Sequence, residues 1–458
     1  MSKNYQEKIK QIQLKKFREM VKVLLKGNRF YKKKLLQCGI KSVNDIKTWE
    51  DFQKIPFTTK KELIDDQKKN PQYGSNLSYP EKDYVYITST SGTASGKRFK
   101  TLYTKSGYEE AVNQEFLWMK SMKITKADRC MFVLPFGLYP MLTEAAMRIG
   151  AKVLPGDGKN SLDLLKNIQD LKPTVIEMSP SGVFHLIEDA KYFGTPLSKL
   201  GVKKIILTGE IGATIPSVRD KVEREWKVDC YDALGSTEVG IFSYECEKKQ
   251  GPHLYEEETI FEVINPKTGK EDIEGELVAT PLWRLDFPFI RYRTGDFVRI
   301  SKKPCKCGCK SATLVGGIIG KVDGSIKIRT VLYYPTEIEG VIRKFPEISE
   351  FRVEIVKRRG LDEMDVVVEL SVMNWSVKDL LFKEMEKYMG FYPNISVVAP
   401  NTLERQAWKT VRIIDKRSQT KVTDKANFKE SIYTKLSGKF YYHYAKLKKL
   451  MMSEEIKD

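Results

Sequence analysis

Short apolar runs alternate with helix-like stretches through the middle of the chain, and this pattern limits the fold more than any other feature. The apolar runs lie at residues 130–134, 175–178 and 204–207, and amphipathic stretches lie at residues 161–171 and 217–226. Strands that are apolar along their whole length are covered on both faces, and helical crossovers join such strands in parallel. The pattern predicts an α/β fold whose large N-terminal domain has parallel or mixed sheets covered by helices.

The chain has 458 residues, which is too long for a single core, so we expect several domains. Apolar side chains at Leu14, Phe17, Val21 and Leu24 recur at helical spacing, which predicts a helical N-terminal part. The sequence becomes strand-rich after residue 254 and then changes to a smaller α+β region. The predicted parts are residues 1–64, 65–322, 323–417 and 418–458, the last a basic, amphipathic C-terminal extension.

The charge of the chain favours anionic partners. Its 79 basic and 60 acidic residues give a net charge of +19, and such a field attracts nucleotides, coenzyme A, an acidic carrier protein or nucleic acid. The lysines are spread over the whole chain, so a lysine-rich surface is the simpler explanation. No apolar run approaches the ~20 residues of a membrane-spanning helix. No apolar segment follows the lysine-rich N-terminus, so we expect a cytoplasmic protein without a secretory signal.

A run of small and hydroxyl residues follows the strand-like segment 83–87 and reads TSTSGTASGK at residues 88–97. Small residues let backbone N–H groups approach a polyphosphate, and hydroxyls and a lysine add donors and positive charge. The run is not a Walker A loop, which needs Ser or Thr where Arg98 stands. A flexible surface loop is the alternative. The candidate phosphate-binding residues are Ser91, Gly92, Thr93, Ser95, Gly96 and Lys97.

This loop resembles the phosphate-binding signature of the adenylate-forming superfamily, which comprises acyl-CoA synthetases, peptide-synthetase adenylation domains and luciferases. Later segments resemble further signatures of that superfamily in the same order, among them GSTE at 235–238 and YRTGD at 292–296. An ionised Asp has two acceptor oxygens, which suits two ribose hydroxyls. The resemblance implies adenine contacts at Gly209 and Glu210, nucleotide contacts at Gly235 and Ser236, a phosphate contact at Thr237, Mg²⁺ on Glu238 and ribose on Asp296.

Two more matches continue the series towards the C-terminus. A segment resembling the hinge signature contains Lys321, which implies a nucleotide contact, and Asp323, about which a small mobile domain rotates. Lys409 stands where the superfamily has its C-terminal lysine, which implies contact with the substrate carboxylate and the α-phosphate. The chain departs from the signatures at Leu234, where Tyr is usual, and at Trp408, where Gly is common.

Three further segments narrow the resemblance to one family. NRFYKK at 28–33, FQKIPFTTK at 52–60 and YYPTEIE at 333–339 resemble segments of phenylacetate–CoA ligases. The family implies an AMP-forming acid–thiol ligase, in which ATP and Mg²⁺ activate an aryl or other small carboxylic acid to an acyl-adenylate with release of pyrophosphate. A thiol such as that of coenzyme A then accepts the acyl group. Rough alignment places the acyl pocket at Phe136, Leu138, Tyr139 and Ala233.

A set of cysteine and histidine residues indicates a metal site. Three thiolates and one imidazole give Zn²⁺ a closed tetrahedral site without a position for water, so the expected role is structural. A proline and a glycine beside the cysteines favour a tight knuckle. The candidate ligands are Cys246, His253, Cys305 and Cys307, with Cys309 left out. Unliganded thiols on two loops are the alternative.

The acceptor of the acyl group stays open. Relatives that use coenzyme A usually have Arg-Gly after the hinge strand, whereas this chain has Arg329 and Thr330. Glycine lets pantetheine pass close to the backbone, and the side chain of Thr330 narrows that path. A carrier protein, an amine or a hydroxyl group are therefore alternative acceptors.

Two interpretations of another kind also stay open. A non-enzymatic, zinc-containing nucleic-acid-binding protein explains the charge and the cysteines, but it does not explain the segments 235–238 and 292–296. A scaffold that has lost catalysis explains the departures from the signatures, but it does not explain the intact Glu238, Asp296 and Lys409. The oligomeric state stays open, and a homodimer is one candidate because dimers are the commonest soluble oligomers.

Overall fold

The structure is a computed structural model, and it describes residues 3–89, 99–133, 140–156, 161–328, 331–358, 360–372, 374–404 and 411–417. The chain divides into two compact units, Met1–Gly324 and Ser325–Asp458. No helix within the described ranges is long and apolar enough to cross a membrane.

The first unit begins with helices, as the spacing of apolar residues predicts. Phe17, Val21 and Leu24 are completely buried and pack in one cluster with residues of the following helices. A capping box starts the last of these helices, because the Thr59 amide donates to the Glu62 carboxylate at 2.8 Å and the Glu62 amide donates to Thr59 Oγ1 at 3.2 Å. The elements are α1 (Lys3–Gly27), α2 (Arg29–Gln37), the 3-10 turn η1 (Val43–Asp45), α3 (Trp49–Gln53) and α4 (Lys60–Lys69).

The middle part of the first unit's sequence forms a five-stranded parallel sheet with the strand order β4-β3-β5-β6-β7. The predicted apolar runs are three of these strands, so the predicted α/β fold is confirmed. The strands are β3 (Arg129–Val133), β4 (Lys152–Leu154), β5 (Val175–Met178), β6 (Lys204–Leu207) and β7 (Asp229–Asp232).

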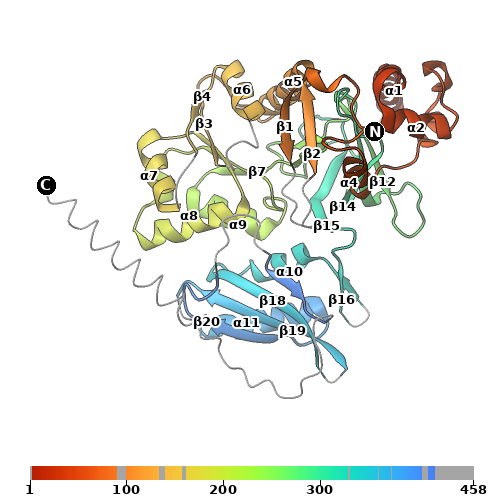
Figure 1. The fold of residues 1–458 in the computed structure, drawn as a ribbon. Helices are drawn as coiled ribbons and strands as arrows, with labels where there is room; N and C mark the ends of the chain where they lie inside the picture. The colour runs from red at the N-terminus through yellow and green to blue at the C-terminus, as the bar shows by residue number, and fades with distance from the viewer. Residues whose placement is uncertain are drawn as a thin grey trace. The chain divides into compact units, whose positions relative to one another are not determined.

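Helices cover both faces of this sheet (Figure 1). Apolar residues of α7, α8 and α9 pack in one cluster with Ile176 and Met178 of β5. Apolar residues of α5 and α6 pack in another cluster with Val175 of the same strand. Alternate side chains of a strand point to opposite faces, so the two clusters lie on opposite sides of the sheet. The helices are α5 (Lys105–Ser121), α6 (Pro140–Ile149), α7 (Ser161–Leu171), α8 (Pro180–Tyr192) and α9 (Pro216–Trp226).

A six-stranded antiparallel sheet forms the remainder of the first unit, in the order β10-β11-β15-β14-β13-β12. Two short antiparallel pairs, β1 with β2 and β8 with β9, accompany it. The strands of the sheet are β10 (Ser243–Tyr244), β11 (His253–Leu254), β12 (Thr259–Ile264), β13 (Glu274–Pro281), β14 (Tyr292–Ser301) and β15 (Thr313–Lys321). The paired strands are β1 (Tyr84–Ser89), β2 (Lys100–Thr104), β8 (Gly235–Ser236) and β9 (Gly240–Ile241), and the 3-10 turns are η2 (Glu81–Asp83) and η3 (Leu197–Lys199).

The second unit is an α+β fold with its own core. Its four-stranded sheet has the order β20-β19-β18-β21, and a hairpin of β16 and β17 precedes it. Apolar residues of both helices pack with the sheet in one cluster. The elements are β16 (Ile326–Ile328), β17 (Val331–Tyr333), α10 (Pro335–Ile342), β18 (Ile348–Arg358), β19 (Leu361–Leu370), α11 (Ser376–Met389), β20 (Asn394–Val398) and β21 (Ile413–Asp415).

Candidate active site and metal centre

Glu238, the candidate Mg²⁺ ligand, lies in the turn between β8 and β9 and is only 6% exposed. Its Oε1 atom lies 3.0 Å from Lys60 Nζ and accepts a hydrogen bond of 3.1 Å from the Tyr292 hydroxyl. Burial and the nearby charge of Glu238 raise the pKa of Tyr292 well above its ordinary value, so this tyrosine stays protonated and donates. Carboxylate oxygens are preferred ligands of Mg²⁺, so the chemistry of the site fits that ion.

Lys60 reaches Glu238 because its segment is bonded to strand β14. Thr58 forms a parallel bridge with Tyr292. The Thr58 amide donates to the Arg291 carbonyl at 3.0 Å, and the Arg293 amide donates to the Thr58 carbonyl at 2.9 Å. This contact was not predicted from the sequence, since nothing in the spacing of the two residues indicates it.

Arg284 holds the turn that carries Thr237 and Glu238. Its Nη1 atom donates to the backbone carbonyls of both residues at 2.8 Å. The guanidinium is completely buried and lies 4.4 Å from the ring centroid of Tyr103 and 4.9 Å from that of Phe289. Such stacking stabilises a buried cation. The role of Arg284 was not predicted from the sequence, because a buried arginine has no local signature.

The rest of the GSTE segment is also fixed by short contacts. Ser236 Oγ accepts a hydrogen bond of 3.1 Å from the Val239 amide, so this hydroxyl closes the turn. A Cβ atom at Gly235 would lie 3.1 Å from the carbonyl oxygen of Gly240, which explains why glycine suits the hairpin. The predicted nucleotide contacts of Gly235, Ser236 and Thr237 stay predictions.

Asp296, the candidate ribose ligand, forms an ion pair across the antiparallel sheet. Its register partner is Lys321 of β15, and Lys321 Nζ lies 2.7 Å from Asp296 Oδ1. Burial raises the pKa of Asp296, while the charge of Lys321 opposes that shift. The charge of Glu238 also raises the pKa of Asp296, so the two candidate carboxylates lie close enough to interact electrostatically.

The segment predicted to cover adenine follows β6. Gly209 has a φ of +82°, a left-handed conformation that favours glycine. Glu210 Oε2 accepts hydrogen bonds from the Ser181 hydroxyl at 2.7 Å and the Ser181 amide at 3.2 Å. This carboxylate therefore joins the segment to the start of α8, and the adenine contact stays a prediction.

Several predicted site residues lie outside the described residues. They are Ser91, Gly92, Thr93, Ser95, Gly96 and Lys97 of the phosphate loop, Phe136, Leu138 and Tyr139 of the acyl pocket, Arg329, Thr330 and Lys409. The fourth pocket residue, Ala233, is 1% exposed and packs in the cluster beneath α5 and α6. The predicted hinge residue, Asp323, is exposed and directly precedes Gly324, where the first compact unit ends.

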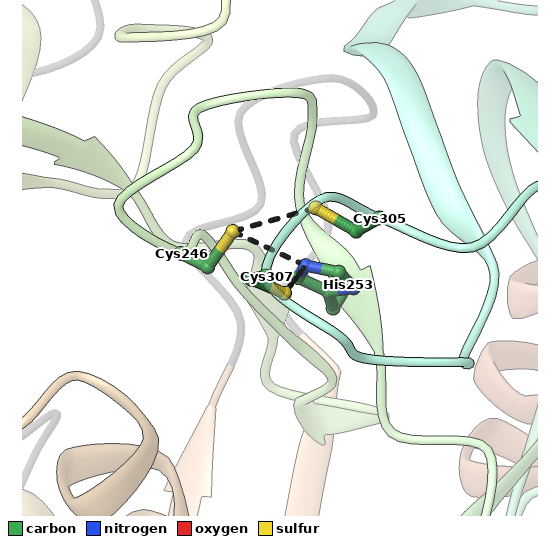
Figure 2. Close-up of side chains that lie close together, drawn as sticks. All are labelled: Cys246, His253, Cys305 and Cys307. Atoms are coloured by element: carbon green, nitrogen blue, oxygen red, sulfur yellow. Dashed lines mark hydrogen bonds between the residues drawn. The ribbon is translucent and has the colours of Figure 1, made fainter.

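The four candidate zinc ligands lie together, as Figure 2 shows. Their ligand atoms are all within 4.8 Å of one another. Cys246 Sγ is 3.7 Å from Cys305 Sγ and 3.4 Å from His253 Nε2, and Cys307 Sγ is 3.5 Å from that nitrogen. A tetrahedral ion with Zn–S distances of about 2.3 Å holds its sulfur atoms about 3.8 Å apart, so the spacing fits Zn²⁺.

The antiparallel sheet brings these ligands together. Cys246 follows β10, His253 begins β11, and Cys305 and Cys307 lie in the loop between β14 and β15. Tyr244 stacks on the imidazole at a centroid distance of 5.1 Å. The set is buried except for Cys307, which is partly exposed, and this suits a closed structural site.

Cys309 lies beside the cluster but outside the set of four. Its sulfur is 3.1 Å from Ser311 Oγ and 3.6 Å from the Tyr244 hydroxyl. The backbone turns sharply here, because the Gly308 amide donates to the Cys305 carbonyl at 3.0 Å and Gly308 has a φ of +91°. Cys309 therefore lies next to the four candidate ligands without being one of them.

Comparisons with known proteins place the chain in the adenylate-forming class of enzymes. The family model of the AMP-binding enzyme C-terminal domain matches residues 330–417. The structure is similar to a crystal structure of a 2-hydroxyisobutyryl-CoA ligase in the postadenylation state, with a TM-score of 0.82, 24% sequence identity and 89% of each chain covered. The likeness at this identity concerns the fold, and it confirms the predicted architecture.

The sequence comparisons identify the family. The chain is 30% identical over 380 residues to the phenylacetate–coenzyme A ligase of Thermus thermophilus, with 80% of this chain and 82% of that protein covered. It is 27% identical over 431 residues to the phenylacetate–coenzyme A ligase of Pseudomonas putida, with 89% of this chain and 94% of that protein covered. The chain belongs to the phenylacetate–coenzyme A ligase family, so the predicted family and the predicted class of AMP-forming acid–thiol ligases are confirmed.

Proposed function

We propose that the protein activates a small carboxylic acid with ATP and then transfers the acyl group to a thiol. In the first step a carboxylate oxygen attacks the α-phosphorus, the bond to the bridging oxygen breaks, and pyrophosphate leaves with that oxygen. In the second step the sulfur of the acceptor attacks the acyl carbon and AMP leaves. The observation that carries the proposal is the buried Glu238, whose charge acts on Asp296, in a member of this family.

The residues have separate roles in this proposal. Asp296 accepts hydrogen bonds from the ribose hydroxyls, and Lys321 moves from it towards the nucleotide. Lys409 and the hydroxyl of Thr237 stabilise the charge that develops on the α-phosphate. Glu238 would hold Mg²⁺, which supplies positive charge against the triphosphate when it is bound. Arg284 and Tyr292 fix Glu238 through the contacts described above.

Coenzyme A is the proposed acceptor, because the relatives that share most of the chain are named for it. A carrier protein or an amine is the alternative, and it is favoured by Thr330, where a glycine is usual in relatives that use coenzyme A. Product analysis distinguishes them. The enzyme with ATP, phenylacetate and coenzyme A is expected to give AMP, pyrophosphate and a thioester detectable by mass spectrometry. AMP release that ignores coenzyme A but requires a carrier protein or an amine would assign the other acceptor.

We also propose that Cys246, His253, Cys305 and Cys307 bind one structural Zn²⁺. The sulfur and nitrogen spacing and the burial of the set support this assignment. Such an ion would tie the segment after β9, which follows Glu238, to the loop after β14, which carries Asp296. Metal analysis of purified protein is expected to give one zinc per chain, and a zinc-free protein of full stability would contradict the proposal.

A further inference from the structure

The parallel sheet has a topological switch point between β3 and β5. After β3 the chain passes to β4 on one side, and it then returns to place β5, β6 and β7 on the other side. In open parallel sheets, ligands bind in the crevice outside the carboxyl ends of the strands where the order reverses. The carboxyl ends of β3 and β5 therefore mark a ligand site independently of any motif.

A buried acid lies at this switch point. Glu177 is the third of the four residues of β5 and is 4% exposed. Its register partners are Phe132 of β3 and Ile206 of β6. It lies on the same face as Val175, which packs with α5 and α6. Among the described residues its Oε2 atom has no hydrogen-bond partner.

A second acid approaches from helix α5. Glu115 is partly exposed and lies four residues after the buried Ala111 and four before the buried Met119 of that helix. Its charge acts on Glu177 and on the hydroxyls of Tyr103 and Tyr255, so these groups face one region. Ala233, which follows β7, packs in the same cluster.

The two acids have no compensating cation in the described part of the chain. Burial raises the pKa of Glu115 to about 8, and burial together with the charge of Glu115 raises the pKa of Glu177 well above its ordinary value. Burying a carboxyl group without a partner destabilises a fold, and an apolar residue at either position would avoid that cost. Within the part of the chain that the structure describes, Glu177 Oε2 is therefore a buried, unpartnered acceptor at the carboxyl end of a switch-point strand, which indicates a function.

We propose that Glu115 and Glu177 bind a protonated nitrogen of the substrate, so that the enzyme activates a carboxylic acid bearing an amine or another basic nitrogen away from its carboxylate. This inference rests on the proposed function, and it narrows the substrate class. A buried ion pair with charge-assisted hydrogen bonds would satisfy both carboxyl groups. A site built for a polar group rejects the analogue that lacks it far more strongly than an apolar site rejects an extra methylene.

Matched pairs of acids test the inference in ATP–pyrophosphate exchange. One pair is 4-(aminomethyl)phenylacetate and 4-ethylphenylacetate, and another is 6-aminohexanoate and heptanoate, so each pair differs by ammonium against methyl. The wild type is expected to prefer the ammonium acid by at least about tenfold in kcat/KM. Glu177→Gln and Glu115→Gln are expected to remove or reverse the preference. Glu110→Gln, on the same helix but bonded to Gln114, is the matched control and is expected to keep it.

The outcomes separate the inference from the proposed function. Exchange that favours the neutral acids, or a preference that Glu177→Gln leaves unchanged, overturns the inference and leaves acid activation intact. No exchange with any acid contradicts the proposed function. In that case, calorimetric titration of the same acid pairs tests binding at Glu115 and Glu177 without catalysis. Equal binding of the two members of each pair would overturn the inference there. Glu177→Leu is expected to raise the thermal midpoint, because it removes an unpartnered buried acid.

Discussion

Among the residues of the first unit, Glu238 is the one on which the proposed chemistry depends most. It is buried, and its local charge is balanced by Lys60 at 3.0 Å. Glu238→Gln keeps the shape of the side chain and removes its charge. We expect pyrophosphate exchange to fall about 100-fold, because one positioned electrostatic group contributes on that scale. Glu274→Gln, which affects a surface pair with Arg299, is the control and should retain full activity.

Lys60 competes with a divalent cation for Glu238 in this account. Its side chain is 38% exposed and can swing away when Mg²⁺ arrives. Lys60→Met is therefore expected to lower the Mg²⁺ concentration for half-maximal exchange by about threefold or more, since a partly exposed pair contributes modestly. Lys61→Met removes only the exposed pair with Asp65 and should leave the midpoint unchanged. A raised midpoint in Lys60→Met would show that Lys60 assists the metal instead.

Glu115 gives stability a specific pH dependence. Its pKa is about 8 in the native protein against an ordinary value of 4.5, so the native state holds a proton that the unfolded chain loses. Stability is then fully present below the ordinary pKa and falls as the pH rises towards 8, by up to about 1.4 kcal/mol per pH unit. Glu115→Gln should flatten this slope in urea denaturation, whereas Glu110→Gln should not. An unchanged slope in Glu115→Gln would contradict the assignment.

At the scale of elements, the cysteine–histidine cluster joins two parts of the antiparallel sheet. If it binds Zn²⁺, the metal-binding free energy is part of the folding free energy. Cys305→Ser should abolish zinc binding and lower the thermal midpoint by roughly 5 °C or more. Cys309→Ser is the matched control, because Cys309 lies outside the four ligands, and it should keep the metal. Equal zinc content in both variants would contradict the ligand set.

The elements that sequence analysis placed well are those with a strong local pattern. The strands at 175–178 and 204–207 and the helix at 161–171 coincide with β5, β6 and α7. Burial of complete strands leaves short apolar runs, and burial of one helix face leaves a helical periodicity. The four members of the cysteine–histidine cluster were recognisable because thiols and imidazoles are rare in this chain.

Contacts between distant segments could not be predicted in the same way. Lys60 and Glu238 meet only because Thr58 pairs with Tyr292, and strand register across such a distance has no local signal. Arg284 is similar, since its partners are backbone carbonyls. The buried Glu177 was included within an apolar run, and only the order of the strands shows that it lies at a switch point.

At the scale of the whole molecule, the chain divides close to Asp323, the residue that the family resemblance predicts as a hinge. The first compact unit ends at Gly324, and the model of the AMP-binding C-terminal domain matches residues 330–417. The first unit holds Glu238 and Asp296, whereas Lys409 belongs to the second part of the chain. Two-step chemistry with a rotation about Asp323 follows from the resemblance and stays a prediction.

Isotope transfer shows whether the substrate carboxylate attacks the α-phosphate. The protein would be incubated with ATP, Mg²⁺, coenzyme A and an accepted acid labelled with ¹⁸O in its carboxylate, and the nucleotide product would be weighed by mass spectrometry. We expect AMP to carry one ¹⁸O atom, because a carboxylate oxygen stays on the phosphorus when the thiol displaces AMP. Unlabelled AMP, or label in inorganic phosphate with ADP as the nucleotide product, would contradict acyl-adenylate formation.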